Sequence, residues 1–304
     1  MSSIVGATIT IILLSASGAP AFAIGGAVAI AVANNMSGVR AAWMQRAGQL
    51  ALNFNAQRMA PQVAGLIALG ALVLSPERSA NVWIVCVGVF QFAAVVITGS
   101  LLGASPSWRI PSMALQRRSI HLVPISWLSH LQYRVDLIAV TFFFPPSQVA
   151  FYSVAVAIQS AVVAVGQSTG MRWFSKHGDA SAVLAAKQTT KISMAGAILA
   201  MAFSWPAIWI AYGIDFMPAA PVALILCIGA VPASVDYLVT HVAIARGTHA
   251  LVVPVKLGIV VAVVILVAGI SALGWPIAAA ALAAMLVTMI GVMIQLRVVS
   301  NAHT

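Results

Sequence analysis

The sequence predicts an all-α fold, a polytopic transmembrane helical bundle of about nine or ten spans. The first observation is composition, because 62% of the 304 residues are hydrophobic and only 7% are charged, with a mean hydropathy of +1.04. Such values exclude a soluble globular domain. The second is that the apolar runs are continuous, whereas an outer-membrane barrel shows alternating segments of about ten residues.

The third observation is the distribution of basic residues. The net charge of +10 comes from 15 Lys and Arg, which fall in every second loop instead of forming one patch. This alternation indicates membrane topology and not nucleic-acid binding, and it places the C-terminus in the cytoplasm. Arg78 is the exception on the outer side, and Arg134 lies inside an apolar run. The other basic residues, Lys256 among them, are expected at the cytoplasmic edge.

In chain order, the first apolar run covers residues 4–34, and Pro20 near its middle favours a break, so it is one span or two. Residues 35–59 follow as a basic cytoplasmic segment that carries Arg46 and Arg58. The remaining spans are predicted where apolar runs of about 15–24 residues, close to the length that crosses a bilayer, are bounded by turns or basic segments. They cover 61–74, 82–102, 121–144, 150–169, 192–212, 221–243, 258–272 and 278–296.

These spans group into three parts. Residues 1–103 form a partial N-terminal bundle of three or four spans, 104–120 a basic cytoplasmic linker with Arg117 and Arg118, and 121–304 a six-helix bundle. The order of a proline, an apolar span, a short turn and a second span occurs after Pro61 and again after Pro254. Such repeats are common in secondary transporters, which bind substrate where the halves meet. We expect the first repeat to lack its opening spans.

Two charges lie at mid-membrane depth in the run 121–144. An ionised side chain there costs about 2.5–3.5 kcal/mol on the insertion scale, and Arg134 cannot lose its proton. Arg134 and Asp136 point about 200° apart on a helix, so His130 shares the face of Arg134 and Gln132 that of Asp136. One face is expected to line a cavity and the other to contact a neighbouring helix. Alternatively, interhelical partners satisfy both charges.

Three further polar residues are candidates for the site. Asp236 lies within the span 221–243 and either binds a coupling cation, as Asp136 could, or pairs with Arg134 or Arg246. Gln159 and Gln167 lie in the span 150–169, where amides commonly join helices or contact a sugar. The sequence contains no phosphate loop, HExxH motif or Cys/His metal spacing. We therefore expect neither enzymatic activity nor a cofactor or metal.

Several short motifs resemble those of a known family. Arg134-Val-Asp136 followed by Gln148-Val-Ala-Phe-Tyr152 is similar to the seventh and eighth helices of Wzx-type flippases. These belong to the multidrug/oligosaccharidyl-lipid/polysaccharide (MOP) superfamily. The outer connection from Tyr212 to Ala219 and the turn Ala245-Arg246-Gly247 resemble the same family. Its members have two six-helix bundles, so against that pattern this chain is expected to be shortened at its N-terminus.

The resemblance implies a flippase that moves a polyprenyl-diphosphate-linked O-antigen or exopolysaccharide unit across the cytoplasmic membrane by alternating access. In this interpretation Arg134, His130, Tyr133, Gln159 and Gln167 contact the substrate. Asp136 and Asp236 bind the coupling ion, while four cytoplasmic arginines gather the anion: Arg46, Arg58, Arg117 and Arg118. Membrane lipids and the polysaccharide polymerase and glycosyltransferases are the expected partners. The alternatives are a cation-coupled antiporter, a membrane-embedded transferase and a non-transporting remnant.

Overall fold

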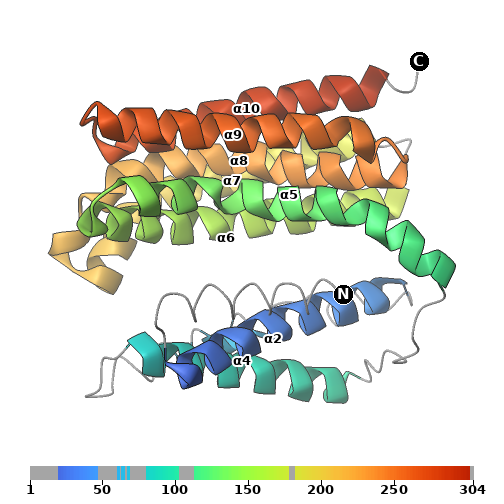
Figure 1. Ribbon diagram of the computed structural model, residues 1–304, viewed down its shortest axis with the longest axis horizontal. Helices are drawn as coiled ribbons and strands as arrows, with labels where there is room; N and C mark the ends of the chain where they lie inside the picture. Colours follow the sequence, from blue (N-terminus) through green and yellow to red (C-terminus); the bar gives the residue numbers. More distant parts are fainter. Residues whose placement is uncertain are drawn as a thin grey trace. The chain divides into compact units, whose positions relative to one another are not determined.

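A computed structural model shows an all-α polytopic helical bundle, as the sequence predicts. It describes residues 20–46, 60–61, 63–65, 67–68, 80–102, 113–177 and 182–301. The chain divides into two compact units, Met1–Pro111 and Ser112–Thr304, and the division falls within the predicted linker 104–120. Figure 1 shows the helices of both units in sequence colours. Arg58, the turn at 76–78 and most of the predicted span 61–74 lie outside the described residues.

The N-terminal unit contains two long described helices, α2 (Ala21–Arg46) and α4 (Ala80–Leu101), which pack against each other. Their backbones touch where Gly26 and Gly88 meet: a Cβ on Gly26 would lie 2.7 Å from Val85 Cα, and one on Gly88 would meet Gly26 O. Glycine allows this approach, as at many interfaces between membrane helices.

Residues 35–46 of the predicted cytoplasmic segment continue α2 as helix. Arg40, on this continuation, donates a hydrogen bond from Nη1 to Val95 O of α4 at 2.6 Å. The carbonyl of Val95 thus gives the guanidinium a partner on the neighbouring helix. Arg40 therefore joins α2 to α4, in addition to its place in the pattern of basic residues.

The C-terminal unit is a bundle of six α-helices, which matches the six spans expected after residue 121. They are α5 (Met113–Phe143), α6 (Pro146–His177), α7 (Ala182–Tyr212), α8 (Ala219–Ala245), α9 (His249–Ala272) and α10 (Ile277–Asn301). A 3₁₀ turn, η2 (Ile214–Phe216), lies in the connection from α7 to α8. Because α5 begins at Met113, residues 113–120 of the predicted linker are helical.

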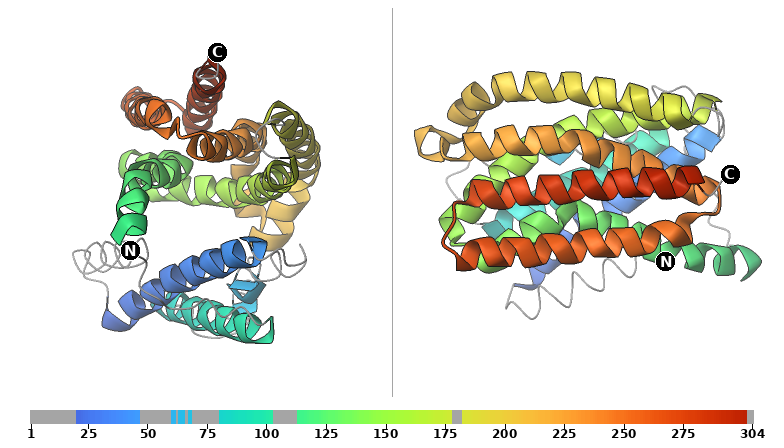
Figure 2. Two further views of the ribbon diagram at one scale, coloured as in Figure 1. Left: turned by 90° about the vertical axis from the view of Figure 1, so that its right-hand side faces the viewer. Right: turned by 90° about the horizontal axis from the view of Figure 1, so that it is seen from above.

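The six helices form two groups that α10 joins. Helix α5 packs along α9, while α8 packs against both α6 and α7, and α10 contacts α8 and α9. Figure 2 shows these helices in two further views. The α5–α6, α7–α8 and α9–α10 connections lie at one end of the bundle, and α10 ends at the other. This arrangement leaves α5 facing α6, α8 and α10 across the middle of the unit.

Glycine ends two of these helices. After α8, Gly247 adopts a φ of 72°, and Thr248 N–H donates to Ala243 O at 2.9 Å. After α9, Gly274 adopts a φ of 68°, and Trp275 N–H donates to Ile270 O at 3.1 Å. Both are Schellman motifs, in which a left-handed residue closes the helix. The predicted turn at 273–275 is confirmed.

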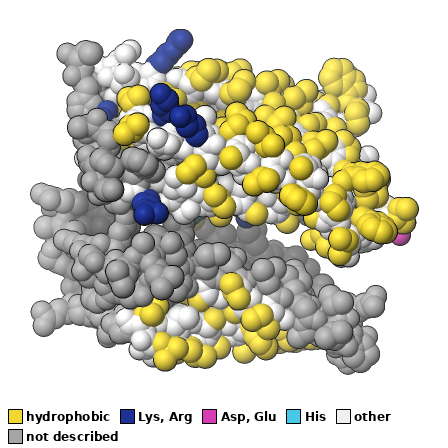
Figure 3. Space-filling model, turned by 180° about the vertical axis from the view of Figure 1, so that it is seen from behind, with side chains coloured by type: hydrophobic (Ala, Val, Ile, Leu, Met, Phe, Trp, Pro, Cys, Tyr) yellow, Lys and Arg dark blue, Asp and Glu magenta, His cyan; other side chains and the backbone are white. Residues whose placement is uncertain are grey.

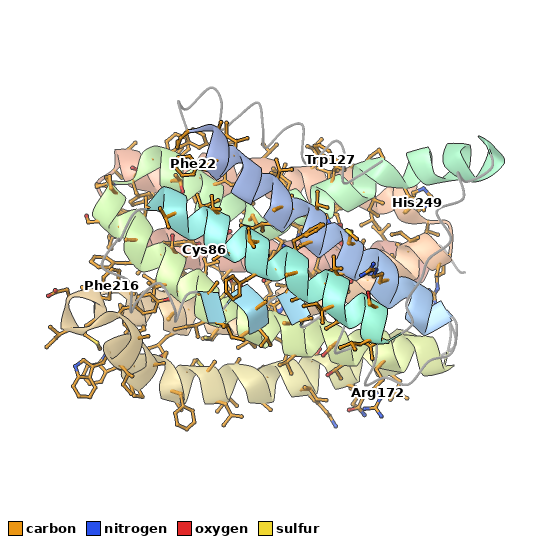
Figure 4. The ribbon with its side chains drawn as sticks, turned by 90° about the horizontal axis from the view of Figure 1, so that it is seen from below. Phe22, Cys86, Trp127, Arg172, Phe216 and His249 are labelled. Atoms are coloured by element: carbon orange, nitrogen blue, oxygen red, sulfur yellow. The ribbon has the colours of Figure 1, made fainter. Side chains whose placement is uncertain are left out.

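Six helices in the described ranges are long and apolar enough to cross a membrane, so the chain is a multi-pass membrane protein. Helix α5, with its internal charges, is not among these six, and α2 contributes a shorter apolar stretch, Ala21–Asn34. On the visible face of the C-terminal unit, Lys and Arg side chains gather toward one end and hydrophobic side chains cover the rest (Figure 3). Arg172 and His249 lie toward one end of this unit and Phe216 at the other (Figure 4).

Candidate functional site

A small cavity with both polar and apolar residues in its wall lies in the C-terminal unit, between α5 and the helices that face it. Its volume is about 50 Å³, and α5, α6, α8, α9 and α10 all contribute to its wall. A volume of this size holds a few water molecules, since one water needs roughly 10–15 Å³ by the same measure. The polar residues in the wall are Ser129, Gln132, Tyr133, Asp136, Gln159, Asp236 and Thr288.

Helix α5 presents two different faces, as its residue spacing predicts. Gln132 and Asp136 line the cavity, whereas His130 and Arg134 are exposed. Residues four apart share a face and residues two apart do not, so Asp136 points inward and Arg134 outward. One face, with Gln132 and Asp136, thus lies on a cavity, whereas the face of His130 and Arg134 is exposed and not packed on a neighbouring helix as the alternative half of the prediction expected.

Asp236 is the centre of a buried hydrogen-bond network. Lys256 Nζ lies 2.7 Å from Asp236 Oδ2 and also donates to Gln132 Oε1 at 3.0 Å. Gln295 Nε2 donates to Asp236 Oδ1 at 2.8 Å. Both carboxylate oxygens are therefore occupied, and side chains of α5, α8, α9 and α10 are joined.

The network corrects two predictions. Lys256 is not a residue of the cytoplasmic edge, because its side chain is fully buried, with 0% exposure. The partner of Asp236 is Lys256 and neither Arg134 nor Arg246. Helix α9 begins at His249, so Lys256 is about 10 Å along the helix at 1.5 Å per residue. Pro254 lies inside α9 and not in its first turn, where proline is common, so this proline does not mark the start of the helix.

The network also has an energetic cost, because one of its buried oxygen atoms lacks a hydrogen bond within the described part of the chain. The side-chain oxygen Oε1 of Gln295 is buried and accepts no hydrogen bond from the described residues. An unsatisfied buried acceptor costs about 1–3 kcal/mol. The amide of Gln295 is held in this orientation because the opposite one would place its oxygen against the Asp236 carboxylate.

Asp136 has a different environment. The Tyr152 hydroxyl on α6 donates to Asp136 Oδ2 at 2.9 Å, and the Tyr152 side chain is fully buried. Among the described residues this phenol is the side chain that hydrogen-bonds to Asp136, and no ammonium or guanidinium lies within 4 Å of it. Sequence reasoning placed Tyr152 in a family-like motif but did not predict its contact with Asp136, because the two residues lie on different helices.

The remaining predicted substrate residues divide between the cavity and the surface. Gln159 and Tyr133 line the cavity, whereas Gln167, His130 and Arg134 do not. The guanidinium carbon of Arg134 lies 4.8 Å from the ring centroid of Tyr133, a distance at which cation–π attraction operates. Within the described part of the chain Arg134 forms no ion pair.

The structure describes the backbone of three of the four predicted anion-gathering arginines. Arg46 is the last residue of α2, and Arg117 and Arg118 belong to the first turns of α5, but their side chains are outside the described set.

In the described ranges no three His, Cys, Asp or Glu side chains lie together as a metal site would require. The cavity thus offers carboxylate, amide and hydroxyl groups, which suit water, a proton or a monovalent cation.

Comparison of the chain with protein-family models, curated proteins and solved structures finds no match. The resemblance to Wzx-type flippases therefore rests on the short motifs in the sequence.

Proposed function

We propose that this chain is a cation-coupled membrane transporter of the alternating-access type. The observation that carries the proposal is a cavity inside an apolar bundle whose wall contains two aspartates, Asp136 and Asp236. Ionisable groups are costly at this depth, so they commonly mark ion pathways and proton relays in membrane proteins. Two carboxylates in one water-sized space provide a place where a coupling cation can bind and leave.

For the cargo, we propose a polyprenyl-diphosphate-linked oligosaccharide, on the strength of the motif around Arg134 and Asp136. A diphosphate and its sugars cross hydrocarbon only along polar protein surface. Arg134 is exposed and forms no ion pair with a described residue, and a guanidinium binds a phosphate through two hydrogen bonds. Arg46, Arg58, Arg117 and Arg118 would attract the same anion on the cytoplasmic side.

The cargo and the coupling ion would use different places. A cavity of about 50 Å³ is far smaller than the 300–1,000 Å³ of ordinary ligand pockets. The oligosaccharide would therefore pass on the side of α5 that carries His130 and Arg134, and the cation would bind on the opposite side. The protein would act in the bacterial cytoplasmic membrane, without enzymatic activity, beside the polymerase and glycosyltransferases of polysaccharide assembly.

A second candidate is a cation-coupled antiporter for a small molecule. One observation favours it: the cavity wall contains two aspartates and no arginine, which suits a cationic cargo better than a diphosphate. In this case Arg134 would be a structural residue of the α5 surface, and the coupling site would be unchanged.

Complementation of a bacterial strain that lacks its own oligosaccharide flippase tests the cargo. At matched expression, Arg134→Ala should abolish surface polysaccharide, Arg134→Lys should restore part of it, and the exposed Arg297→Ala should behave as wild type. Wild-type activity of Arg134→Ala would show that Arg134 does not contact the diphosphate. Cation-driven flux of small cationic dyes in proteoliposomes, without complementation, would favour the antiporter.

A further inference from the structure

The two carboxylates of the cavity have unequal partners. Asp236 receives the Lys256 ammonium on one oxygen and the Gln295 amide on the other. Asp136 receives the Tyr152 phenol on Oδ2, and its other oxygen has no side-chain donor among the described residues. One carboxylate is thus neutralised by a buried ammonium, while the other receives, from the part of the chain that the structure describes, only neutral donors, the Tyr152 phenol and nearby backbone N–H groups.

A cation could bind Asp236 only by displacing Lys256. The Lys256 ammonium is fully buried and also donates to Gln132. A displaced ammonium would lose both Asp236 and Gln132 and would have no other described partner nearby. A buried charge without a partner is unfavourable. Exchange at Asp136 requires no such displacement, because the phenol can stay on Oδ2 while a cation occupies the second oxygen.

The other groups around Asp136 allow this exchange. Tyr133 and Gln132 on α5, Gln159 and Tyr152 on α6, and Thr288 on α10 are neutral donors and acceptors. The charged group that lines the cavity from α8 is Asp236, and the buried Lys256 of α9, which is not in the wall, pairs with it and cancels its charge. Arg134 and His130, on α5 itself, face away from the cavity.

Gln132 contributes a further neutral group to the cavity wall. Its side-chain oxygen accepts a hydrogen bond from Lys256, and its side chain is only 8% exposed.

We propose that Asp136 holds the exchangeable monovalent cation, a proton or Na⁺, while Asp236 stays paired with Lys256 and serves to position α5, α8, α9 and α10. The inference rests on the proposed cation coupling and assigns it to one carboxylate. On protonation, a hydronium ion that enters the cavity from the aqueous phase gives its proton to the second oxygen of Asp136 and leaves as a neutral water molecule.

Infrared difference spectroscopy of the purified full-length protein tests the assignment without any transport measurement. The chain has only five Asp and Glu, so the carboxyl bands are few. Spectra are recorded between acid and alkaline pH, and between Na⁺ and choline at constant pH. The variants are Asp136→Asn, the double variant Asp236→Asn/Lys256→Met, and the control Asp215→Asn in the exposed outer connection.

We expect the band of a buried carboxyl to respond to pH or to Na⁺ in wild type, in the double variant and in the control. The response should be lost in Asp136→Asn. A response to pH alone identifies the proton, and a response to Na⁺ at constant pH identifies sodium. A response that persists in Asp136→Asn, or no response in wild type, would overturn the proposal.

Tyr152→Phe provides a second measurement that keeps every carboxylate. Loss of the phenol hydrogen bond should shift the frequency of the responding band, and an unshifted band would contradict the assignment to Asp136. These results are separable from the proposed function. A protein that binds the cation on Asp136 but transports nothing would disprove transport alone, and a working transporter with an inert Asp136 would disprove the assignment alone.

Discussion

The Lys256 ammonium and the Asp236 carboxylate lie 2.7 Å apart inside the C-terminal unit, 20 residues apart in the chain. Their helices, α8 and α9, are consecutive but make few contacts with each other. The ion pair therefore connects two helices that side-chain packing alone holds only weakly. It also places a positive charge beside one of the two carboxylates of the cavity wall.

Removal of one member of this pair should destabilise the bundle more than removal of both. Lys256→Met or Asp236→Asn leaves a buried charge without its partner, which costs about 3–5 kcal/mol. The double variant should recover much of this loss, because no isolated charge remains. Thermal unfolding of the detergent-solubilised protein, analysed as a double-mutant cycle, measures the coupling, and additive effects would show that the two charges are independent.

The α2–α4 contact should be sensitive to one methyl group at Gly26 and insensitive to one at Gly25. A Cβ at Gly26 would lie 2.7 Å from Val85 Cα, whereas at Gly25 nothing lies within 4 Å. Gly26→Ala is expected to cost about 1–3 kcal/mol through overpacking, and Gly25→Ala should be neutral or slightly stabilising. Protease protection of the N-terminal unit compares the two variants, and equal protection would argue against close contact of the helices.

The two glycines that end α8 and α9 should resist replacement. Gly247 and Gly274 have positive φ, so alanine at either position costs about 1–2 kcal/mol in the left-handed conformation. Gly269 is the matched control, because it lies within α9 and has open space around its Cα. Gly269→Ala should leave the midpoint of thermal unfolding unchanged or raise it. A larger loss at Gly269 than at Gly274 would contradict this account.

The membrane topology can be tested with two single cysteines. In a Cys86→Ser/Cys227→Ala background, Ser300→Cys near the end of α10 should react with a membrane-impermeant maleimide only after the cells are opened. Ile214→Cys, in the exposed connection between α7 and α8, should react in intact cells. The bias of Lys and Arg toward one side sets this orientation. The reverse pattern, or reaction of both from one side, would refute the cytoplasmic C-terminus.

Much of the fold was predictable because hydrophobicity and turn residues act locally. The α7–α8 connection and the turn at Gly274 followed from glycine, proline and polar residues between apolar runs. Helix ends at the basic side were missed, since residues such as Lys187 and Lys191 continue α7 as helix. Charge marks the membrane boundary but does not end a helix.

The sequence predicted which site residues share a face of one helix, but not which residues of different helices contact each other. The spacing of Gln132, Arg134 and Asp136 determined which residues share a face. No local pattern indicates that Tyr152 reaches Asp136 or that Lys256 reaches Asp236, because these contacts depend on how α5, α6, α8 and α9 pack. The depth of Lys256 was misjudged for the same reason, since the start of α9 was placed too late.

The order of synthesis separates the two members of the Lys256–Asp236 pair in time. The ribosome completes Asp236 before Lys256, and the 20 residues between them take about one to four seconds at 5–20 residues per second. During that interval α8 carries a carboxylate whose counter-ion has not yet been made. We therefore expect α8 to remain in the translocon, or beside it, until α9 arrives, so that the two helices enter the lipid as a hairpin.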